Sequence, residues 1–497
     1  MFFCKYYTTN LTFILLMIIS ILFTNEFLVF PIKIYHPYNF SVINNSDSFS
    51  AEDFLKYWAK NELYTYIYIG TPPVKVCTFL ESEDYECFMD NSICPLHSVY
   101  KNDSSSTFIR NSDFNIYYST FSHMCFAKET FWAYTDFKLN ENKIKKLDNL
   151  TFLYARNPNR DELLSKLNNY NINITGFSCL HMGFQLSSSN FFDIMVNQLK
   201  DKDYIESTYW TIEFNSNNLF ESNDLDYLVI GLPPHKYNPN KYDENFFKTT
   251  VAQLRTKDYD LRVNSWGLNF DKIYFSNNVS SGYIQYKVIK CKFLFSLNII
   301  EGSREYLDNI ENEFFNQLYE EKICNKNEII DNNENYFVIW CNKNNFSQIK
   351  KFPTLYFKSI ELNYTFELTY EDLFVPNKNK IFFMVIFKKR GYMFTLGKIF
   401  LKKYLMAFSF DNKLIGFYDN NNKISKHNNK LKNNENNLKK NIIISIFMLF
   451  CFILLFIVFI MIKKRCLTER QKRMNELVDD NYIYMINKAS QNNSTIN

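Results

Sequence analysis

The side chains of this 497-residue chain that could do chemistry include a short acidic run, Glu81-Ser82-Glu83-Asp84, which begins eleven residues after Gly70. Paired carboxylates can act as general acid and base on a water or a carbonyl. Other reaction centres find less support. Gly176-Phe177-Ser178 lacks the second glycine of a nucleophile elbow, and six dispersed histidines offer no metal-ligand spacing. We therefore expect no metal and no cofactor.

The composition sets broad limits on partners and architecture. Lys and Arg number 56 against 52 Asp and Glu, which gives a formal net charge of +4. That balance is too mild to indicate a nucleic-acid partner. The length allows two or three domains with a large buried core. The chain has only 10 glycines, although tight turns with positive φ usually need this residue.

The elements that must position any site are mainly short strands. Aromatic and β-branched runs bounded by Asn, Asp, Ser or Gly predict strands. They occur at Tyr64–Ile69, Phe114–Tyr118, Tyr209–Phe214, Tyr227–Ile230, Phe270–Phe275, Thr354–Phe357 and Phe408–Phe410. Helical patterns are few, at Ala51–Lys60, Phe191–Lys200, Tyr306–Glu320 and Lys398–Tyr404. Many strands with few helices predict an all-β protein.

Two apolar segments predict the membrane topology. Leu11–Phe23 follows a short region containing Lys5 and is typical of a signal peptide, here residues 1–24, with an uncleaved anchor as the alternative. Ile442–Ile462 has 21 residues and no charge, enough to span a bilayer as a helix. Residues 420–441 then form a polar stalk, and residues 463–497 a cytosolic tail. We expect a single-pass type I protein of the secretory pathway or cell surface, with its β domain luminal or extracellular.

Eight cysteines lie between the two apolar segments. An even number on the secretory route favours disulfides, and scattered buried thiols are the alternative. They are Cys77, Cys87, Cys94, Cys125, Cys179, Cys291, Cys324 and Cys341.

From about Tyr64 to Tyr418, several segments in order resemble the pepsin-like aspartic proteases (peptidase A1, plasmepsin-like). Tyr68-Ile69-Gly70-Thr71-Pro72-Pro73 resembles their opening hairpin, and Tyr118 stands where the flap tyrosine belongs. Further matches are Ser105–Phe108, Gly176–Leu180, Leu228–Gly231, Ser265–Ile273, Phe352–Phe357, Thr395–Tyr404 and Ile415–Phe417. The resemblance implies a bilobal acid-protease fold with an interlobe cleft. It places a prosegment-like region at residues 25–60, an N-terminal lobe at 61–255 and a C-terminal lobe at 256–419.

The resemblance also locates the family's catalytic positions. Such an enzyme needs one aspartate from each lobe, and the two share a proton and hold a water between them. In this chain Glu81 takes the first position and Leu294 the second, while Ser82 keeps a hydroxyl and Phe295 replaces the second threonine. A single, lengthened carboxylate that faces an apolar residue cannot share a proton across the lobes. No catalytic pair is therefore intact.

Two disulfides follow from sequence proximity and from the family's habit of a short bridge near each position. They are Cys87–Cys94 in the first lobe and Cys324–Cys341 in the second. The sequence does not assign partners to the other four cysteines.

These features predict a membrane-anchored pseudoprotease that binds a peptide or protein in the interlobe cleft and reaches the membrane through Ile442 to Ile462. One alternative is an active aspartic-type endopeptidase with a non-standard centre that uses Glu81. Another is a structural subunit of a membrane-bound complex. No nucleic-acid partner is expected.

Overall fold

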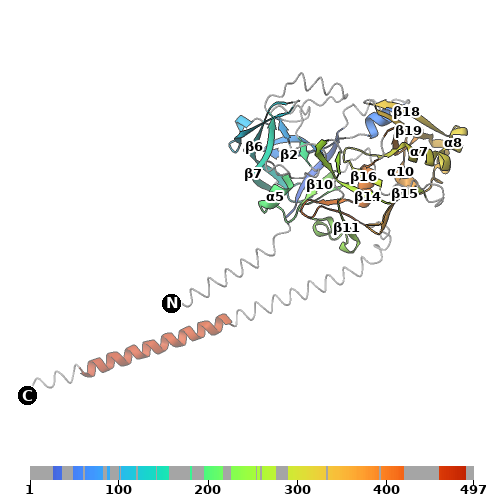
Figure 1. Ribbon diagram of the computed structural model, residues 1–497. Coiled ribbons are helices and arrows are strands. Elements are labelled where there is room, and N and C mark those ends of the chain that lie inside the picture. Colours follow the sequence, from blue (N-terminus) through green and yellow to red (C-terminus); the bar gives the residue numbers. More distant parts are fainter. Residues whose placement is uncertain are drawn as a thin grey trace, which may run out of the picture. The chain divides into compact units, whose positions relative to one another are not determined.

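The protein is described by a computed structural model that covers residues 26–35, 49–59, 62–81, 87–89, 100, 102–118, 121–140, 143–155, 179–181, 195–215, 225–252, 255–257, 260–275, 289–331, 334–390, 393–418 and 458–487. The chain divides into two compact units, residues 1–420 and residues 421–497. The predicted division of this unit at residue 255 stays a prediction. To name parts of the chain, we call the described residues 26–252 the first lobe and the described residues 255–418 the second lobe. Figure 1 shows β2, β6 and β7 in the first lobe and β18, β19 and α8 in the second.

A 13-stranded sheet runs through the first lobe and continues into the last strands of the second. Its order is β11-β27-β26-β9-β10-β1-β2-β3-β8-β4-β7-β6-β5. The strands are β1 (Leu28–Tyr35), β2 (Glu62–Ile69), β3 (Val74–Glu81), β4 (Cys87–Met89), β5 (Ile109–Tyr118), β6 (Phe121–Tyr134), β7 (Ile144–Ala155), β8 (Cys179–His181), β9 (Tyr209–Glu213), β10 (Asp226–Ile230), β11 (Phe247–Val251), β26 (Ala407–Ser409) and β27 (Leu414–Tyr418). Because β26 pairs with β9 and β27 with β11, the backbone itself joins the lobes.

The second lobe has its own nine-stranded sheet, in which β18 branches from the path β14-β16-β25-β17-β24-β19-β23-β22. Its strands are β14 (Gly267–Phe270), β16 (Ile289–Phe293), β17 (Ile300–Ser303), β18 (Cys324–Asp331), β19 (Glu334–Asn342), β22 (Phe374–Asn377), β23 (Lys380–Phe383), β24 (Val385–Lys388) and β25 (Phe394–Leu396). Two small sheets are formed by β15 (Lys272–Phe275), β20 (Leu355–Ser359) and β21 (Tyr364–Leu368), and by β12 (Arg255–Lys257) and β13 (Asp260–Ser265). The prediction of a mostly β protein is confirmed.

The described helices of the first unit are short. They are α3 (Ala51–Asp53), α5 (Met195–Asp201), α6 (Pro234–Tyr237), α7 (Arg304–Ile310), α8 (Asn316–Glu320), α9 (Phe346–Ile349), α10 (Tyr370–Leu373) and α11 (Lys398–Tyr404), with π-helical η1 (Phe54–Ala59) and η5 (Glu311–Phe315) and 3₁₀ turns η2 (Asn102–Ser104), η4 (Glu244–Phe246) and η6 (Lys343–Asn345). α11 has the bounds that the sequence predicts. The predicted helix Tyr306–Glu320 is also present, with η5 joining α7 to α8.

One strand prediction needs correction. The run Phe270–Phe275 was expected to be a single strand, but β14 ends at Phe270 and β15 begins at Lys272. β14 pairs with β16 in the large sheet of the second lobe, whereas β15 pairs with β20 in the small one. Asp271, between them, accepts a hydrogen bond from the backbone N–H of Ile360. The chain therefore changes sheets at this residue, which a period-two pattern does not reveal.

The described residues before residue 60, namely 26–35 and 49–59, contact both lobes. β1 lies between β10 and β2, with Ile32 opposite both Asp226 and Thr65. The helical turn at Ala51–Ala59 begins with a capping box between Ser50 and Asp53, and it packs against the second lobe, where the ring of Phe54 stacks on Phe382 at 4.6 Å between centroids. Whether this region acts as a prosegment stays a prediction.

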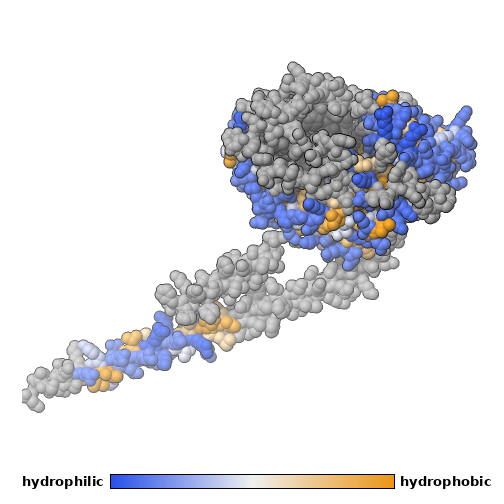
Figure 2. Space-filling model, in the orientation of Figure 1, coloured by the Kyte–Doolittle hydropathy of each residue, from blue (hydrophilic) through white to orange (hydrophobic). Residues whose placement is uncertain are grey.

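The described part of the second unit is a helix at residues 458–487 with exposed side chains. Within the described residues, we find no helix that is both long enough and apolar enough to cross a membrane. The predicted span Ile442–Ile462 lies outside the described residues except for its last five, and the signal peptide, stalk and last tail residues also lie outside them. Figure 2 shows that the described surface of the first unit is mostly hydrophilic on this face, with small separate hydrophobic patches.

Candidate functional site

The first half of the candidate site is the end of β3, where Glu81 is the last residue of the strand. β3 runs parallel to β8, so that Leu80 lies opposite Leu180 and Glu81 lies opposite His181. β8 in turn pairs antiparallel with β4, and β4 pairs parallel with β7. Ser82, the next predicted site residue, lies outside the described residues.

The second half is the end of β16, which the same pattern of pairings surrounds. β16 is parallel to β25, β25 is antiparallel to β17, and β17 is parallel to β24. Phe293 lies opposite Leu396, and the backbone N–H of Leu294 donates to the carbonyl oxygen of Leu396 at 3.1 Å. The two lobes thus repeat one arrangement of four strands.

This repeat makes Glu81 and Leu294 equivalent positions. Glu81 precedes Cys87, the first residue of β4, by six residues, and Leu294 precedes Ile300, the first residue of β17, by the same number. Each follows the residue that lies opposite a leucine of the parallel partner strand. The strand pairings therefore place Glu81 and Leu294 at equivalent positions of the two lobes.

The repeat also reveals a residue that the sequence analysis missed. His181 follows Leu180 in β8 as Gly397 follows Leu396 after β25. His181 lies one residue after the segment Gly176–Leu180 that resembles the family. The sequence signal that could have identified it is the pair Leu180-His181, because it parallels Leu396-Gly397. A histidine, and not a glycine, stands opposite Glu81.

Tyr118, the predicted flap residue, ends β5. It lies opposite Phe121 of β6, so the two strands form a hairpin at this point. The role of Tyr118 as a flap residue stays a prediction.

The hairpin that leads to Glu81 is anchored by a buried carboxylate that the sequence analysis did not identify. Glu129 is fully buried and accepts hydrogen bonds from the Tyr100 hydroxyl at 2.5 Å and the Thr130 backbone N–H at 2.7 Å. The backbone N–H of Gly70, at the end of β2, donates to the Thr130 carbonyl oxygen at 2.8 Å. A buried carboxylate needs such donors to be stable. Glu129 is thus a positioning residue for the β2–β3 turn.

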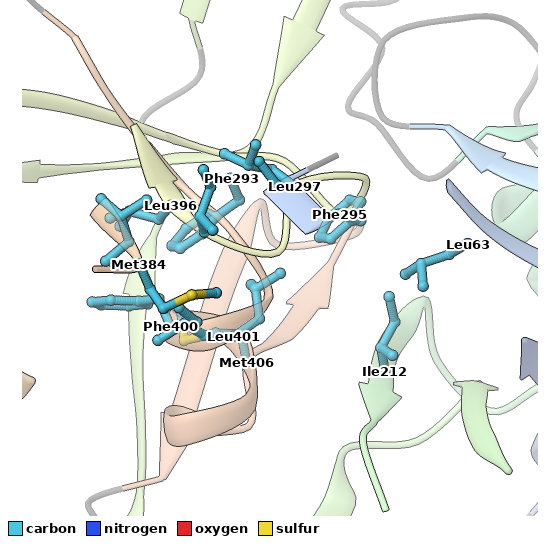
Figure 3. Close-up of a cluster of buried hydrophobic side chains, with 14 of the residues drawn as sticks. Leu63, Ile212, Phe293, Phe295, Leu297, Met384, Leu396, Phe400, Leu401 and Met406 are labelled. Atoms are coloured by element: carbon cyan, nitrogen blue, oxygen red, sulfur yellow. The ribbon is translucent and has the colours of Figure 1, made fainter. Parts of the chain in front are cut away.

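The surroundings of Leu294 are apolar. Phe293, Phe295 and Leu297 are all at most 2 % exposed, and Leu294 itself is half-buried against the same core. Figure 3 shows Phe293 close to Leu396, with Phe400 and Leu401 of α11 on the same side of the cluster. An ionised carboxylate in such a place would lose hydration without gaining a charged partner. At Leu294, this half of the site has an apolar side chain, whereas sharing a proton with Glu81 would require a second carboxylate.

Gly397 fixes the backbone of the second half. A Cβ atom built on Gly397 would lie 2.2 Å from the carbonyl oxygens of both Leu297 and Ile299. Because those contacts are to backbone atoms, a rotamer change could not relieve them. The backbone N–H of Lys398 also donates to the Leu297 carbonyl oxygen at 2.7 Å. The loop after β16 therefore packs directly on the start of α11.

Phe295 takes the position where the family has a threonine that braces one loop against the other. Its ring meets Trp210 of β9 edge-on at 5.0 Å and Phe408 of β26 at 5.6 Å. Figure 3 shows Phe295 on the side of the cluster toward Leu63 and Ile212 of the first lobe. At this position the Phe295 ring packs against Trp210 of the first lobe, whereas the family has a threonine hydroxyl.

Asn298, in the same loop, ties the N-terminal segment to the site. Its side-chain nitrogen donates to the Trp58 carbonyl oxygen at 2.7 Å, and its backbone N–H donates to the Ala59 carbonyl oxygen at 3.0 Å. Asn298 is 1 % exposed, so both bonds lie in the interior, where an unpaired donor is costly. The loop after β16 is therefore held by residues that precede the first-lobe hairpin.

A buried ion pair crosses between the lobes beside this loop. The Lys398 Nζ atom lies 3.3 Å from the Asp226 carboxylate, and both side chains are 2 % exposed. Asp226 also accepts from the backbone N–H of Asn215 at 2.8 Å, and the Lys398 ammonium lies 4.8 Å from the centroid of the Phe214 ring. Burial lowers the pKa of Lys398, and Asp226 opposes that shift. The ammonium group of Lys398, the residue after Gly397, is thus paired with the Asp226 carboxylate.

The expected second-lobe bridge is present, because Cys324 and Cys341 form a disulfide across β18 and β19. Cys94 lies outside the described residues, so the Cys87–Cys94 bridge stays a prediction. Among the described residues, no group of three or more His, Cys, Asp or Glu side chains could hold a metal ion.

The comparisons with known proteins agree with this geometry. The family model described as eukaryotic aspartyl protease matches residues 64–419, more than half of the chain. No curated protein matches the chain. The match begins in β2 and extends just past β27, so it includes both halves of the candidate site. The chain therefore belongs to the eukaryotic aspartyl protease family.

Proposed function

We propose that this protein is a catalytically inactive, membrane-anchored member of its family that binds a peptide or protein. One observation carries the proposal. Leu294 occupies the position equivalent to Glu81, in surroundings that are apolar. The family's reaction needs a carboxylate at each position, so the second half lacks the group that would share the proton.

The energetic consequence is large. Losing one member of a catalytic unit typically costs several powers of ten in rate, and each power corresponds to about 1.36 kcal/mol of barrier. In the first half, the carboxylate of Glu81 extends one methylene further than an aspartate, although such groups must be placed within about 0.5 Å. We infer that the remaining carboxylate does not support hydrolysis.

A binding role is supported by the buried hydrogen bonds that hold the loops on both sides of the candidate site. Glu129 holds the β2–β3 turn and Asn298 holds the loop after β16. In the family, the substrate peptide lies between the two halves, so we propose that a peptide or an extended protein segment binds there without being cut. We further propose that Ile442–Ile462 anchors the protein in a secretory-pathway or cell-surface membrane.

A digestion experiment tests the proposal. The full-length protein is incubated with a peptide library between about pH 3 and pH 7, a range that brackets carboxylate titration. Glu81→Ala is the matched variant, and bound peptides are recovered in parallel and identified by mass spectrometry. We expect no cleavage by either protein, and recovery of a restricted set of intact peptides.

The outcomes separate the candidate functions. Cleavage that disappears in Glu81→Ala would overturn the proposal and make the protein an endopeptidase that uses Glu81. Cleavage that persists in the variant would also overturn inactivity and would place the reaction elsewhere. Absence of both cleavage and peptide recovery would reject the binding role and favour a structural subunit.

A further inference from the structure

A pocket of about 200 Å³ opens on the first lobe, over β1, β2 and β3. Its lining residues come from these strands, from β6, and from two positions outside strands; they are Pro31, Lys33, Tyr66, Tyr68, Lys75, Tyr134, Leu139 and Leu225. Tyr66 and Tyr68 alternate along β2 with Ile67 and Ile69, which are fully buried in the core. Because side chains alternate between the faces of a strand, the pocket lies on the opposite face from that core.

The charged side chains among the described lining residues are two lysines, Lys33 and Lys75. The Nζ atoms of Lys33 and Lys75 lie 5.8 Å and 4.3 Å from the centroid of the same ring, that of Tyr66. The strand register explains this convergence, because Lys33 is opposite Tyr64 and Lys75 is opposite Tyr68, the two residues that flank Tyr66 on the same face. No acidic side chain is among the described residues that line the pocket. Two ammonium groups are thus directed at one small space.

The rest of the lining combines aromatic surface with hydroxyl groups. The Tyr68 and Tyr134 hydroxyl oxygens lie 3.4 Å apart, and their rings meet edge-on at 6.2 Å. Tyr66 is 7 % exposed, so its ring forms a buried floor. Pro31, Leu139 and Leu225 add apolar contacts. Apolar walls with a few convergent polar groups are typical of small-molecule sites.

We propose that this pocket binds an organic anion about the size of one amino-acid side chain, with its carboxylate or phosphate group between Lys33 and Lys75 and its apolar body against the tyrosine rings. Lysine recognises either group as a point charge. The site is independent of the proposed function, because Lys75 precedes Glu81 by six residues on β3, which is roughly 20 Å along an extended strand.

Calorimetric titration of the full-length protein tests this site. The probes are phenylacetate and phenyl phosphate, with benzyl alcohol as the neutral counterpart. The variants are Lys33→Gln and Lys75→Gln, which keep most of the side-chain stem, and Lys75→Arg, which keeps the charge. Lys248→Gln is the matched control, because Lys248 makes a similar contact to a tyrosine ring, 4.5 Å from the centroid of Tyr364, away from the pocket.

We expect at least one anion to bind, and to bind at least tenfold more weakly in each glutamine variant of the pocket. Lys75→Arg and Lys248→Gln should retain binding within about threefold, and added salt should weaken it. The tighter anion identifies the group as carboxylate or phosphate. Binding of neither anion, equal binding of benzyl alcohol, or unchanged affinity in both pocket variants would overturn the proposal. Near-ultraviolet circular dichroism confirms that each variant is folded.

Discussion

The strand pairs β3–β8 and β16–β25 have the same geometry and opposite chemistry. In the first lobe the pair ends in Glu81 opposite His181, two polar residues. In the second lobe it ends in Leu294 followed by Phe295, beside Leu396 and Gly397, and nearly all of this is hydrocarbon. The same arrangement of strands therefore forms around a polar end in one lobe and an apolar end in the other.

Different forces hold the two halves. The first-lobe hairpin is anchored by hydrogen bonds to a buried carboxylate, Glu129. The second-lobe loop is anchored by close backbone packing at Gly397, by ring contacts of Phe295 and by Asn298. We therefore expect substitutions in the second half to lower the free energy of unfolding. The loss should be larger where the substituted residue is packed more tightly.

The largest effect is expected for Gly397→Ala. The new Cβ atom would lie 2.2 Å from two backbone oxygens, so the loop must move away from α11. We expect a loss of about 4 kcal/mol or more in the free energy of unfolding, measured by urea denaturation.

Gly302→Ala is the control for this substitution. Its Cβ atom would meet ring carbons of Phe394 at 3.0 Å and Phe387 at 3.2 Å, and side chains can yield more easily than backbone. A Gly397→Ala protein as stable as Gly302→Ala would contradict the packing assigned to the second half.

Phe295→Ala should have the next largest effect. It removes a ring that is 2 % exposed and contacts both Trp210 and Phe408. Phenylalanine-to-alanine changes in cores cost about 3 to 5 kcal/mol, and we expect about 3 kcal/mol because Phe295 itself lies in a loop, which can partly close the cavity.

Phe346→Ala serves as the comparison, since Phe346 is 37 % exposed and should lose less than about 1 kcal/mol. Equal losses in the two variants would show that Phe295 does not brace the lobes.

A smaller effect is expected for Asn298→Ala. The substitution leaves the buried Trp58 carbonyl oxygen without its donor, which should cost about 2 kcal/mol. Hydrogen exchange should also become faster in residues 51–59, because their link to the second lobe is weakened.

Asn342→Ala removes a similar side-chain hydrogen bond, 3.3 Å to the Lys322 carbonyl oxygen, which is exposed to solvent. We expect little change there. If exchange in residues 51–59 were unaltered by Asn298→Ala, the anchoring role of this residue would be wrong.

The smallest effect is expected for His235, which lies outside both halves of the site and makes the stability of the protein depend on pH. The His235 Nδ1 atom lies 2.9 Å from the Tyr418 hydroxyl. Burial lowers the pKa of His235 and Lys236 adds to this, while Glu244 opposes it. The folded protein therefore binds this proton less readily than the unfolded chain. The contribution of His235 to stability is complete above about pH 6.5 and falls as the pH drops from there through the lowered value.

Urea unfolding of the wild type and of His235→Gln at several pH values between about 5 and 8 measures this contribution. The stability difference between the two proteins should change with pH in the stated direction. A constant difference across that range would refute the assignment.

Several parts of the fold could be predicted from the sequence because their signals are local. The strand Tyr64–Ile69 with Gly70 and the helix Lys398–Tyr404 are set by side-chain pattern and by residues at their ends. Cys324 and Cys341 are close enough in sequence for neighbouring strands to bring them together. The break at Asp271 could not be predicted, because it depends on which of two sheets each side of the residue joins.

By itself, the sequence determined the residue types at two positions, Glu81 and Leu294, of which only the first carries a carboxylate. Only the tertiary structure decided that these positions are equivalent, that His181 lies opposite Glu81, and that Asn298 and Phe295 fasten the second loop to distant segments. The physical reason is the distance along the sequence over which each property is set. Side-chain chemistry and strand periodicity depend on neighbouring residues. Register between strands and contacts across more than a hundred residues form only when the whole core packs.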